Sequence, residues 1–270
     1  MKSFSVPGTD SRLRYHDLAG DGPAIVFVHG LGCASSCDYP AVAAAPALRG
    51  RRMLLVDLLG SGFSDRPQGF GYTIEQHAGS VAMLIEALGL PRVELFGHSM
   101  GGAVAVTAAT KLGGRLHRLV LGEPNLVPGG GVSSRRVATM SEADYIAKGH
   151  AALAYASRGE GNDIWAASLA GSAAHAVHRA ARSLVTGSEP SWRSLLGGLA
   201  APRTMIVGET SLPYAEAEGL PEIGVEVRIV PKAGHSMAWE NPLGLAEAIA
   251  GTQDREIAGT RRGDGPAAIV

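Results

Sequence analysis

Short runs of apolar residues recur along the chain, and most end at a glycine or a charged residue. They occupy residues 24–28, 52–57, 92–96, 119–122, 204–209 and 225–230. Runs of this kind are typical of strands that are covered on both faces in a parallel sheet. Residues 73–88 instead carry apolar side chains at helical spacing. The alternation of the two patterns predicts an α/β fold with a mostly parallel sheet flanked by helices.

One apolar run leads straight into a glycine-bounded serine. After residues 92–96 come Gly97, His98, Ser99, Met100 and Gly101, followed by an alanine-rich segment of helical character. A sharp strand-to-helix turn would project the serine hydroxyl, and glycines two residues to either side leave room for that turn. The pattern predicts a nucleophile elbow at Ser99. An ordinary strand-glycine-helix connection is the alternative.

A second turn of this type follows the run at 24–28, where the sequence reads His29, Gly30, Leu31, Gly32. In a parallel sheet both turns lie at the carboxyl edge, so we expect the amides of Leu31 and Met100 to form a two-donor oxyanion hole. We expect His29 to shape the loop and not to act as a base.

The candidate base is His235, which lies in a glycine-containing loop after the run at 225–230. From such a loop an imidazole can reach a serine on a neighbouring strand. A structural loop histidine is the alternative reading of this residue.

The order of these motifs, together with the Gly-Ser-Gly-Phe-Ser turn that follows Asp57, resembles the α/β-hydrolase superfamily. The resemblance spans nearly the whole chain, and it is to members with a serine nucleophile and a helical cap. It implies an α/β-hydrolase fold with Ser99 as nucleophile and His235 as base. Because dehalogenase and epoxide-hydrolase relatives carry aspartate at the elbow, serine here points to acyl transfer.

The position of the carboxylate that would partner His235 departs from the family pattern. Most relatives carry a carboxylate shortly after the Gly-Glu that ends the strand at 204–209, but this chain has Ser211 there. A histidine base needs a partner that fixes its tautomer. Glu123, at the end of the run at 119–122, is our predicted replacement, as in some cap-bearing relatives. Glu209 is the second choice, and the use of no acid is the third.

The resemblance also predicts the domain organisation. Residues 1–123 and 203–251 form the hydrolase core, residues 124–202 form a helical cap, and residues 252–270 form a flexible tail. The cap would supply an acyl pocket, although apolar residues at helical spacing more often serve packing. His175 and His178 share a helical face and are expected to be solvated, not metal-bound. Candidate pocket residues are Cys33 beside the oxyanion loop and Tyr145, Trp165, Leu169 and Trp192 in the cap.

Composition narrows the possible partners. The formal net charge is −1 and the basic residues are scattered, so a nucleic-acid partner is not expected. The amino terminus lacks a signal-peptide core and no apolar run could span a bilayer, so we expect a cytoplasmic protein. The two cysteines, Cys33 and Cys37, indicate neither a disulfide framework nor a metal site. The sequence does not indicate the oligomeric state.

The predicted function is two-step hydrolysis of a small-molecule ester, lactone or thioester through an acyl-enzyme on Ser99. This chemistry needs no metal or organic cofactor. The same residues could instead serve an acyl-transfer cyclase or thioesterase, a carbon–carbon bond hydrolase or a cofactor-free perhydrolase. A non-catalytic receptor for a small ligand is the alternative from another class.

Overall fold

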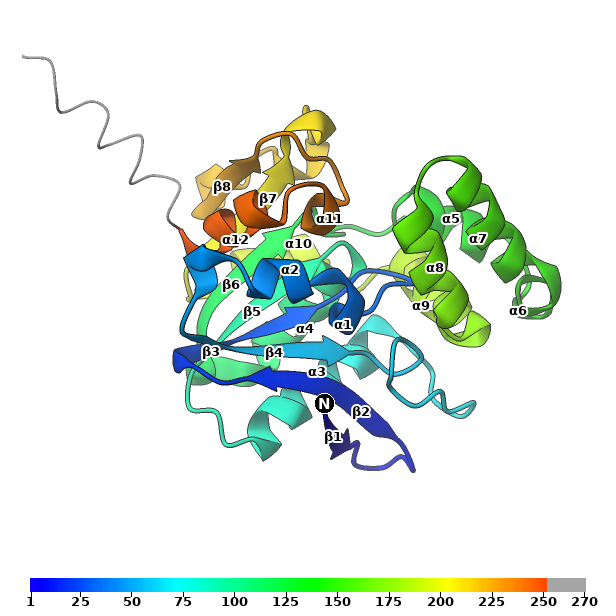
Figure 1. The fold of residues 1–270 in the computed structure, drawn as a ribbon, viewed down its shortest axis with the longest axis horizontal. Helices are drawn as coiled ribbons and strands as arrows, with labels where there is room; N and C mark the ends of the chain where they lie inside the picture. Colours follow the sequence, from blue (N-terminus) through cyan, green and yellow to red (C-terminus); the bar gives the residue numbers. More distant parts are fainter. Residues whose placement is uncertain (252–270) are drawn as a thin grey trace, which may run out of the picture.

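The computed structural model describes residues 1–251, so the predicted tail 252–270 lies outside the described residues. An eight-stranded sheet runs through the molecule in the order β1-β2-β4-β3-β5-β6-β7-β8 (Figure 1). Neighbours are parallel from β4 across to β8, whereas β1 and β2 are antiparallel. The predicted mostly parallel α/β fold is therefore confirmed. The strands are β1 (Lys2–Ser5), β2 (Arg12–Leu18), β3 (Asp21–Val28), β4 (Arg51–Asp57), β5 (Val93–His98), β6 (Leu116–Gly122), β7 (Arg203–Gly208) and β8 (Val225–Val230).

Helices cover both faces of the sheet. α3 and α4 lie on one face, and the other is covered by α2 and α12. The α-helices are α1 (Ser35–Asp38), α2 (Pro40–Ala43), α3 (Ile74–Ala87), α4 (Met100–Leu112), α5 (Val132–Ala138), α6 (Glu142–Asp144), α7 (His150–Gly159), α8 (Asp163–Gly171), α9 (Ala174–Thr186), α10 (Trp192–Gly197), α11 (Met237–Glu240) and α12 (Pro242–Ala250). Short 3₁₀ turns occur at Pro46–Leu48, Gly113–Arg115, Glu209–Ser211, Ala215–Ala217 and Pro221–Ile223, and Tyr145–Gly149 forms a π-helical turn.

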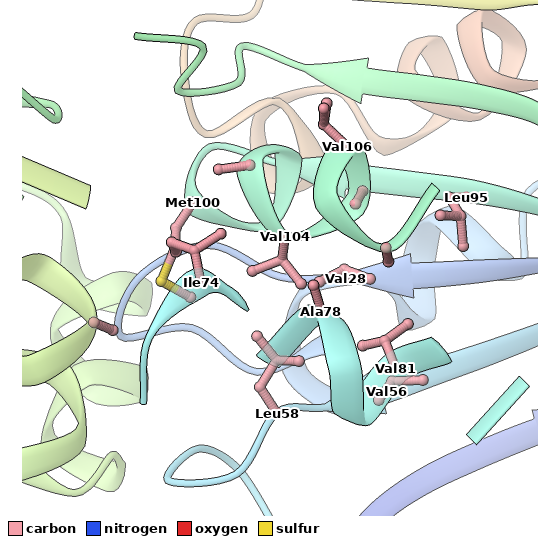
Figure 2. Close-up of a cluster of buried hydrophobic side chains, with 14 of the residues drawn as sticks. Val28, Val56, Leu58, Ile74, Ala78, Val81, Leu95, Met100, Val104 and Val106 are labelled. Atoms are coloured by element: carbon pink, nitrogen blue, oxygen red, sulfur yellow. The ribbon is translucent and has the colours of Figure 1, made fainter. Parts of the chain in front are cut away.

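The two hydrophobic cores follow from strand alternation. Val28 faces α3 and α4, in the cluster shown in Figure 2, while Phe27 faces the opposite side. On that opposite side Phe27 packs against Tyr39 and Phe96, with ring centroids 5.2 and 5.4 Å away. Because successive side chains point to opposite faces, one apolar run supplies both cores. This explains why the central strands read as continuous apolar sequence.

The predicted helix at 73–88 is confirmed as α3. Thr73 caps it by accepting a hydrogen bond from the amide of Gln76, whose side chain accepts one from the amide of Thr73. This capping box satisfies amides that have no partner inside the helix. The chain leaves the helix at Gly89, which has a φ of 61°.

Helices α5 to α9 form a lobe beside the carboxyl edge of the sheet (Figure 1). α10 lies within the predicted cap segment, but it packs against α4 of the core. His175 and His178 on α9 are buried, so the expectation that they are solvated was wrong. Their face of α9 packs against the loop after β4 and against α6 and the turn that follows it.

Hydrogen bonds to backbone carbonyls tie this lobe to the core. The amide of Ala173 donates to the Gly60 carbonyl at 2.8 Å, and the guanidinium of Arg66 donates to the Gly171 carbonyl at 2.8 Å. Within residues 1–251, none of the helices combines the length and apolar character needed to cross a membrane.

Buried histidines make the fold sensitive to acid. Burial of His77 lowers its pKa from 6.5 to about 3, and within residues 1–251 its Nδ1 has no hydrogen-bond partner. Between these pH values the unfolded chain binds a proton that the native state does not bind. The free energy of unfolding should therefore decrease as the pH is lowered, by up to about 1.4 kcal/mol per pH unit on account of this residue.

Urea denaturation at pH values from about 7.5 down to about 5 tests this expectation. His77→Asn should make the pH slope shallower than that of the wild type. Phe70→Leu is the control, because it loosens packing against the same ring without changing a titratable group. Equal slopes for His77→Asn and the wild type would refute the assignment.

Candidate active site

Ser99 lies at the turn between β5 and α4, in a backbone conformation that residues other than glycine rarely adopt. Its φ is 53° and its ψ is −120°. The chain can turn this sharply because Gly97 has no side chain: a Cβ there would lie only 2.3 Å from the Gly101 carbonyl oxygen. A Cβ on Gly101 would lie equally close, at 2.3 Å, to the carbonyl oxygen of Val28. Only glycine fits at these two positions, so the first turn of α4 lies directly on the ends of β5 and β3.

The loop after β3 is held by His29. The Nε2 of this buried ring accepts a hydrogen bond from the amide of Leu58 at 3.0 Å, so the ring proton is on Nδ1, which donates to the Gly30 carbonyl at 2.8 Å. Burial lowers the pKa of His29, which favours this neutral form. His29 thus joins the loop after β3 to the loop after β4.

The two predicted oxyanion donors belong to adjoining segments. Met100 is the first residue of α4, so its amide has no partner inside the helix. Leu31 lines the same pocket as Ser99, and its carbonyl accepts a hydrogen bond from Trp165 Nε1 at 2.9 Å. Leu169 of the same helix contacts Gly32, where a Cβ would lie 2.7 Å from Leu169 Cδ1. Helix α8 therefore packs directly on the loop that carries Leu31.

Glu123 and His235 meet across the end of β7. Glu123 Oε2 accepts a hydrogen bond from His235 Nδ1 at 2.7 Å, and Oε1 accepts one from the Gly208 amide at 2.9 Å. The Glu123 side chain is only 2% exposed. Burial alone would raise the pKa of Glu123, but hydrogen bonds from His235, the Gly208 amide and the Ser211 hydroxyl lower it overall. The carboxylate is therefore ionised, and Ser211 is one of the groups that stabilise the charge.

The His235 loop rests on β7. A Cβ on Gly208 would lie 2.5 Å from the carbonyl oxygens of both Ala233 and Gly234, so the loop and the strand are in backbone contact. Glu209, the second-choice acid, accepts a hydrogen bond from the amide of Lys232 at 2.8 Å. Glu209 is exposed and contacts the start of the loop, not the imidazole.

His98 supports the loop from the other side. Its Nε2 lies 2.8 Å from the His235 carbonyl oxygen, and the two rings are in contact. Burial and the neighbouring His235 lower the pKa of His98 to about 3, so the ring is neutral. It can therefore donate one hydrogen bond to this carbonyl without placing a second charge beside His235.

A cavity of about 460 Å³ lies beside Ser99, Glu123 and His235. Of the predicted residues, Ser99, Glu123, His235, Leu31, Cys33 and Trp165 line it. The structure does not bring Tyr145 and Trp192 to this cavity. Tyr145 is buried against His150 within the lobe, and Trp192 is buried at the start of α10. Lining residues that the sequence analysis did not single out include Asp38, Tyr39, Asn125, Tyr214, Glu216 and Trp239.

The arrangement has the requirements for nucleophilic chemistry. Because His235 Nδ1 donates to Glu123, its Nε2 carries the free lone pair that can accept a proton. Ser99 lines the same cavity, and within residues 1–251 no hydrogen bond joins its hydroxyl to His235. Such contacts often tighten only when substrate is bound.

Comparison with known proteins gives both sequence and structural matches. A family model described as alpha/beta hydrolase fold matches residues 23–185. The 2-hydroxy-6-oxo-2,4-heptadienoate hydrolase of Pseudomonas putida is 38% identical over 107 residues, which cover 39% of this chain and 38% of that protein. Haloalkane dehalogenase 2 of Mycobacterium bovis is 37% identical over 112 residues, covering 41% of this chain and 38% of that protein. These matches thus span well under half the length of either relative.

Two solved structures resemble nearly the whole chain. A thermophilic esterase from Thermogutta terrifontis has a TM-score of 0.77 at 23% identity, covering 96% of this chain and 98% of that one. An enol-lactonase from Burkholderia xenovorans has a TM-score of 0.73 at 23% identity, covering 95% of this chain and 100% of that one. At this identity the likeness shows the shared fold.

The backbone contact at Gly208 yields a stability prediction. Gly208→Ala should force the His235 loop off β7 and lower the free energy of unfolding by about 1–3 kcal/mol. Gly79→Ala is the matched control, because a Cβ there meets nothing within 4 Å and Gly79 lies inside α3. It should raise the free energy of unfolding by up to about 1 kcal/mol. Urea denaturation of both variants gives these free energies. If Gly208→Ala left the free energy of unfolding unchanged, the close contact between the His235 loop and β7 would be refuted.

Proposed function

The chain belongs to the α/β hydrolase family, and on that premise we propose that it is a serine hydrolase acting on a small acyl substrate. The bond cleaved is a carboxylic ester, lactone or thioester, and the reaction passes through an acyl-enzyme on Ser99. Glu123, His235 and Ser99 act as a triad, with the amides of Leu31 and Met100 as the oxyanion hole.

One observation carries this proposal. The buried carboxylate of Glu123 binds His235 Nδ1 at 2.7 Å, and His235 lines the same cavity as a serine held in a strained turn. A purely structural pair would not need its imidazole to line a cavity that is also lined by a serine in a strained turn. Strain of this kind occurs mainly where function requires it.

The mechanism follows from the placement of the protons. Ser99 Oγ attacks the carbonyl carbon while His235 Nε2 takes the hydroxyl proton, and Glu123 stabilises the imidazolium that results. The substrate oxygen becomes an anion that the Leu31 and Met100 amides can bind. The leaving alcohol or thiol departs with the proton from His235. Water then repeats the sequence, releasing the acid and restoring Ser99.

The serine argues against the reaction named for one relative. Haloalkane dehalogenase 2 resembles this chain over part of its sequence, but dehalogenase members of the superfamily carry aspartate at the elbow. This chain has Ser99 there, a hydroxyl in place of a carboxylate. The proposal therefore keeps the family's fold and excludes that chemistry.

Carbon–carbon bond hydrolysis is a second candidate. It is favoured by the 38% identity to a hydrolase named for 2-hydroxy-6-oxo-2,4-heptadienoate, which covers 38% of that protein. Analysis of products from a vinylogous diketone and from a matched ester distinguishes the two reactions, since only carbon–carbon cleavage releases a product with a new carbon–hydrogen bond.

The nucleophile can be tested by intact-mass analysis after treatment with a fluorophosphonate. The wild type should gain one phosphonyl group with loss of fluoride, because the activated Ser99 oxygen attacks phosphorus. Ser99→Ala, the control, should gain none. Absence of an adduct on the native wild type would overturn the enzyme proposal and favour a receptor.

The acid can be tested with a matched pair of substitutions. Glu123→Gln should lower kcat by about 10³- to 10⁴-fold, because the amide no longer fixes the imidazole tautomer or stabilises its charge. Glu209→Gln changes a carboxylate that contacts only the loop backbone, so kcat should change by less than about threefold. Steady-state kinetics with an activated ester gives both values. The reverse order of effects would move the role of acid to Glu209.

A further inference from the structure

Three residues that line the cavity at Ser99 carry buried polar atoms without a hydrogen-bond partner among residues 1–251. Within residues 1–251, Asp38 Oδ1, Tyr39 OH and Trp239 Nε1 are buried and have no hydrogen-bond partner. Asp38 is 4% exposed and Tyr39 is 1% exposed. All three residues line the cavity that also contains Ser99 and His235. They come from α1, the residue that follows it, and α11, so two separate parts of the chain bring them together.

Unpaired buried polar atoms are costly. Each loses its hydrogen bonds with water and receives nothing in return from the protein. Tyr39 is otherwise a packing residue, because its ring contacts Phe27 and Phe96 in the core. Phenylalanine would make those ring contacts equally well. The Tyr39 hydroxyl therefore contributes nothing to the packing that the structure shows.

Asp38 is connected to the serine turn through Cys33. The Cys33 thiol hydrogen-bonds to the Asp38 carboxyl, whose Oδ1 has no partner within residues 1–251. Cys33 Sγ and Ser99 Cβ lie 3.7 and 3.4 Å from the point that a Cβ on Gly30 would occupy. Cys33 thus lies between Asp38 and the turn that carries Ser99. A substrate bound at Ser99 would extend past Cys33 to reach Asp38.

The three groups complement an uncharged amide. Trp239 Nε1 only donates, the Tyr39 hydroxyl can donate, and the Asp38 carboxyl can accept. An amide offers one carbonyl acceptor and an N–H donor in the same plane. Resting on the proposed function, we propose that Asp38, Tyr39 and Trp239 form a subsite that binds an amide group of the acyl substrate, taking its N–H on Asp38 and donating to its carbonyl.

The charge of Asp38 supports an uncharged ligand group. Burial raises the pKa of Asp38 to about 7, so a substantial part of the protein carries an ionised carboxylate here at neutral pH. A carboxylate on the substrate would be repelled by that anion in a buried place, whereas an amide would not.

The test uses two fluorophosphonates of equal chain length, one ending in a primary carboxamide and the other in an isopropyl group of the same shape. A series of chain lengths covers the distance from Ser99 to the subsite. The measured quantity is the ratio of the two second-order inactivation rate constants. At the best length the wild type should favour the carboxamide, and Tyr39→Phe or Trp239→Phe should lower the ratio by about three- to tenfold.

Tyr72→Phe is the control, because Tyr72 is a buried tyrosine outside the cavity whose hydroxyl donates to the Pro67 carbonyl. It should leave the ratio unchanged and lower the melting temperature. Tyr39→Phe should not lower the melting temperature, since its hydroxyl has no partner to lose. A ratio near one at every length overturns the subsite. The subsite is also overturned if Tyr39→Phe lowers the melting temperature and leaves the ratio unchanged, because the Tyr39 hydroxyl of the wild type would then have a structural partner.

The two proposals fail in different ways. If neither probe reacts with the wild type, the proposed function fails. Calorimetry with the two corresponding unreactive phosphonates then tests the subsite alone. Preferential binding of the carboxamide that Tyr39→Phe abolishes would support it, and equal binding of both would overturn it.

Discussion

Direct contact between backbone segments is the constraint on which the site depends. Gly97 and Gly101 bring the start of α4 onto the ends of β5 and β3, and Gly208 brings the His235 loop onto β7. Any Cβ at these positions would lie 2.3 to 2.5 Å from a carbonyl oxygen. Removing three side chains thus lets loops from separate strands converge at one edge of the sheet. The groups of the proposed site are then held on loops that pack against strand ends, and sites supported by regular elements are positioned more precisely than sites on free loops.

The buried carboxylate at Glu123 follows from this geometry. An ionised group that is 2% exposed must be paired, and the amide of Gly208 and the imidazole of His235 both reach it across the end of β7. Ser211, which follows the Gly-Glu at the end of β7, contributes a hydroxyl to the same carboxylate. The carboxylate and this hydroxyl therefore come from the ends of two neighbouring strands, β6 and β7. Glutamate has the length that this route to His235 requires.

The central strands and the helix at 73–88 could be predicted because burial on both faces and helical periodicity leave local patterns. β1 and β2 were not predicted, although on β2 Leu13 and Tyr15 alternate with arginines, as in a strand with one buried face. Trp165 and Trp192 show why the residues that line the cavity could not all be predicted from the sequence. Both lie on short helices among aliphatic residues, so the local sequence does not distinguish them. Trp165 lines the cavity because α8 packs on the loop after β3, whereas Trp192 is buried in the core because α10 packs on α4.

Trp165 also shows why the lobe and the reaction centre should be considered together. Its indole lines the cavity and donates to the carbonyl of Leu31, the residue whose amide is one of the two proposed oxyanion donors. Orientation of that peptide segment therefore depends partly on where α8 lies. The lobe is tied to the core through the loops after β4, at Gly60 and Arg66, and His29 joins those loops to the loop of Leu31. A displacement of the lobe would thus reach the loop of Leu31 by two routes, so under the proposed function the position of the lobe and the orientation of the proposed oxyanion donor are coupled.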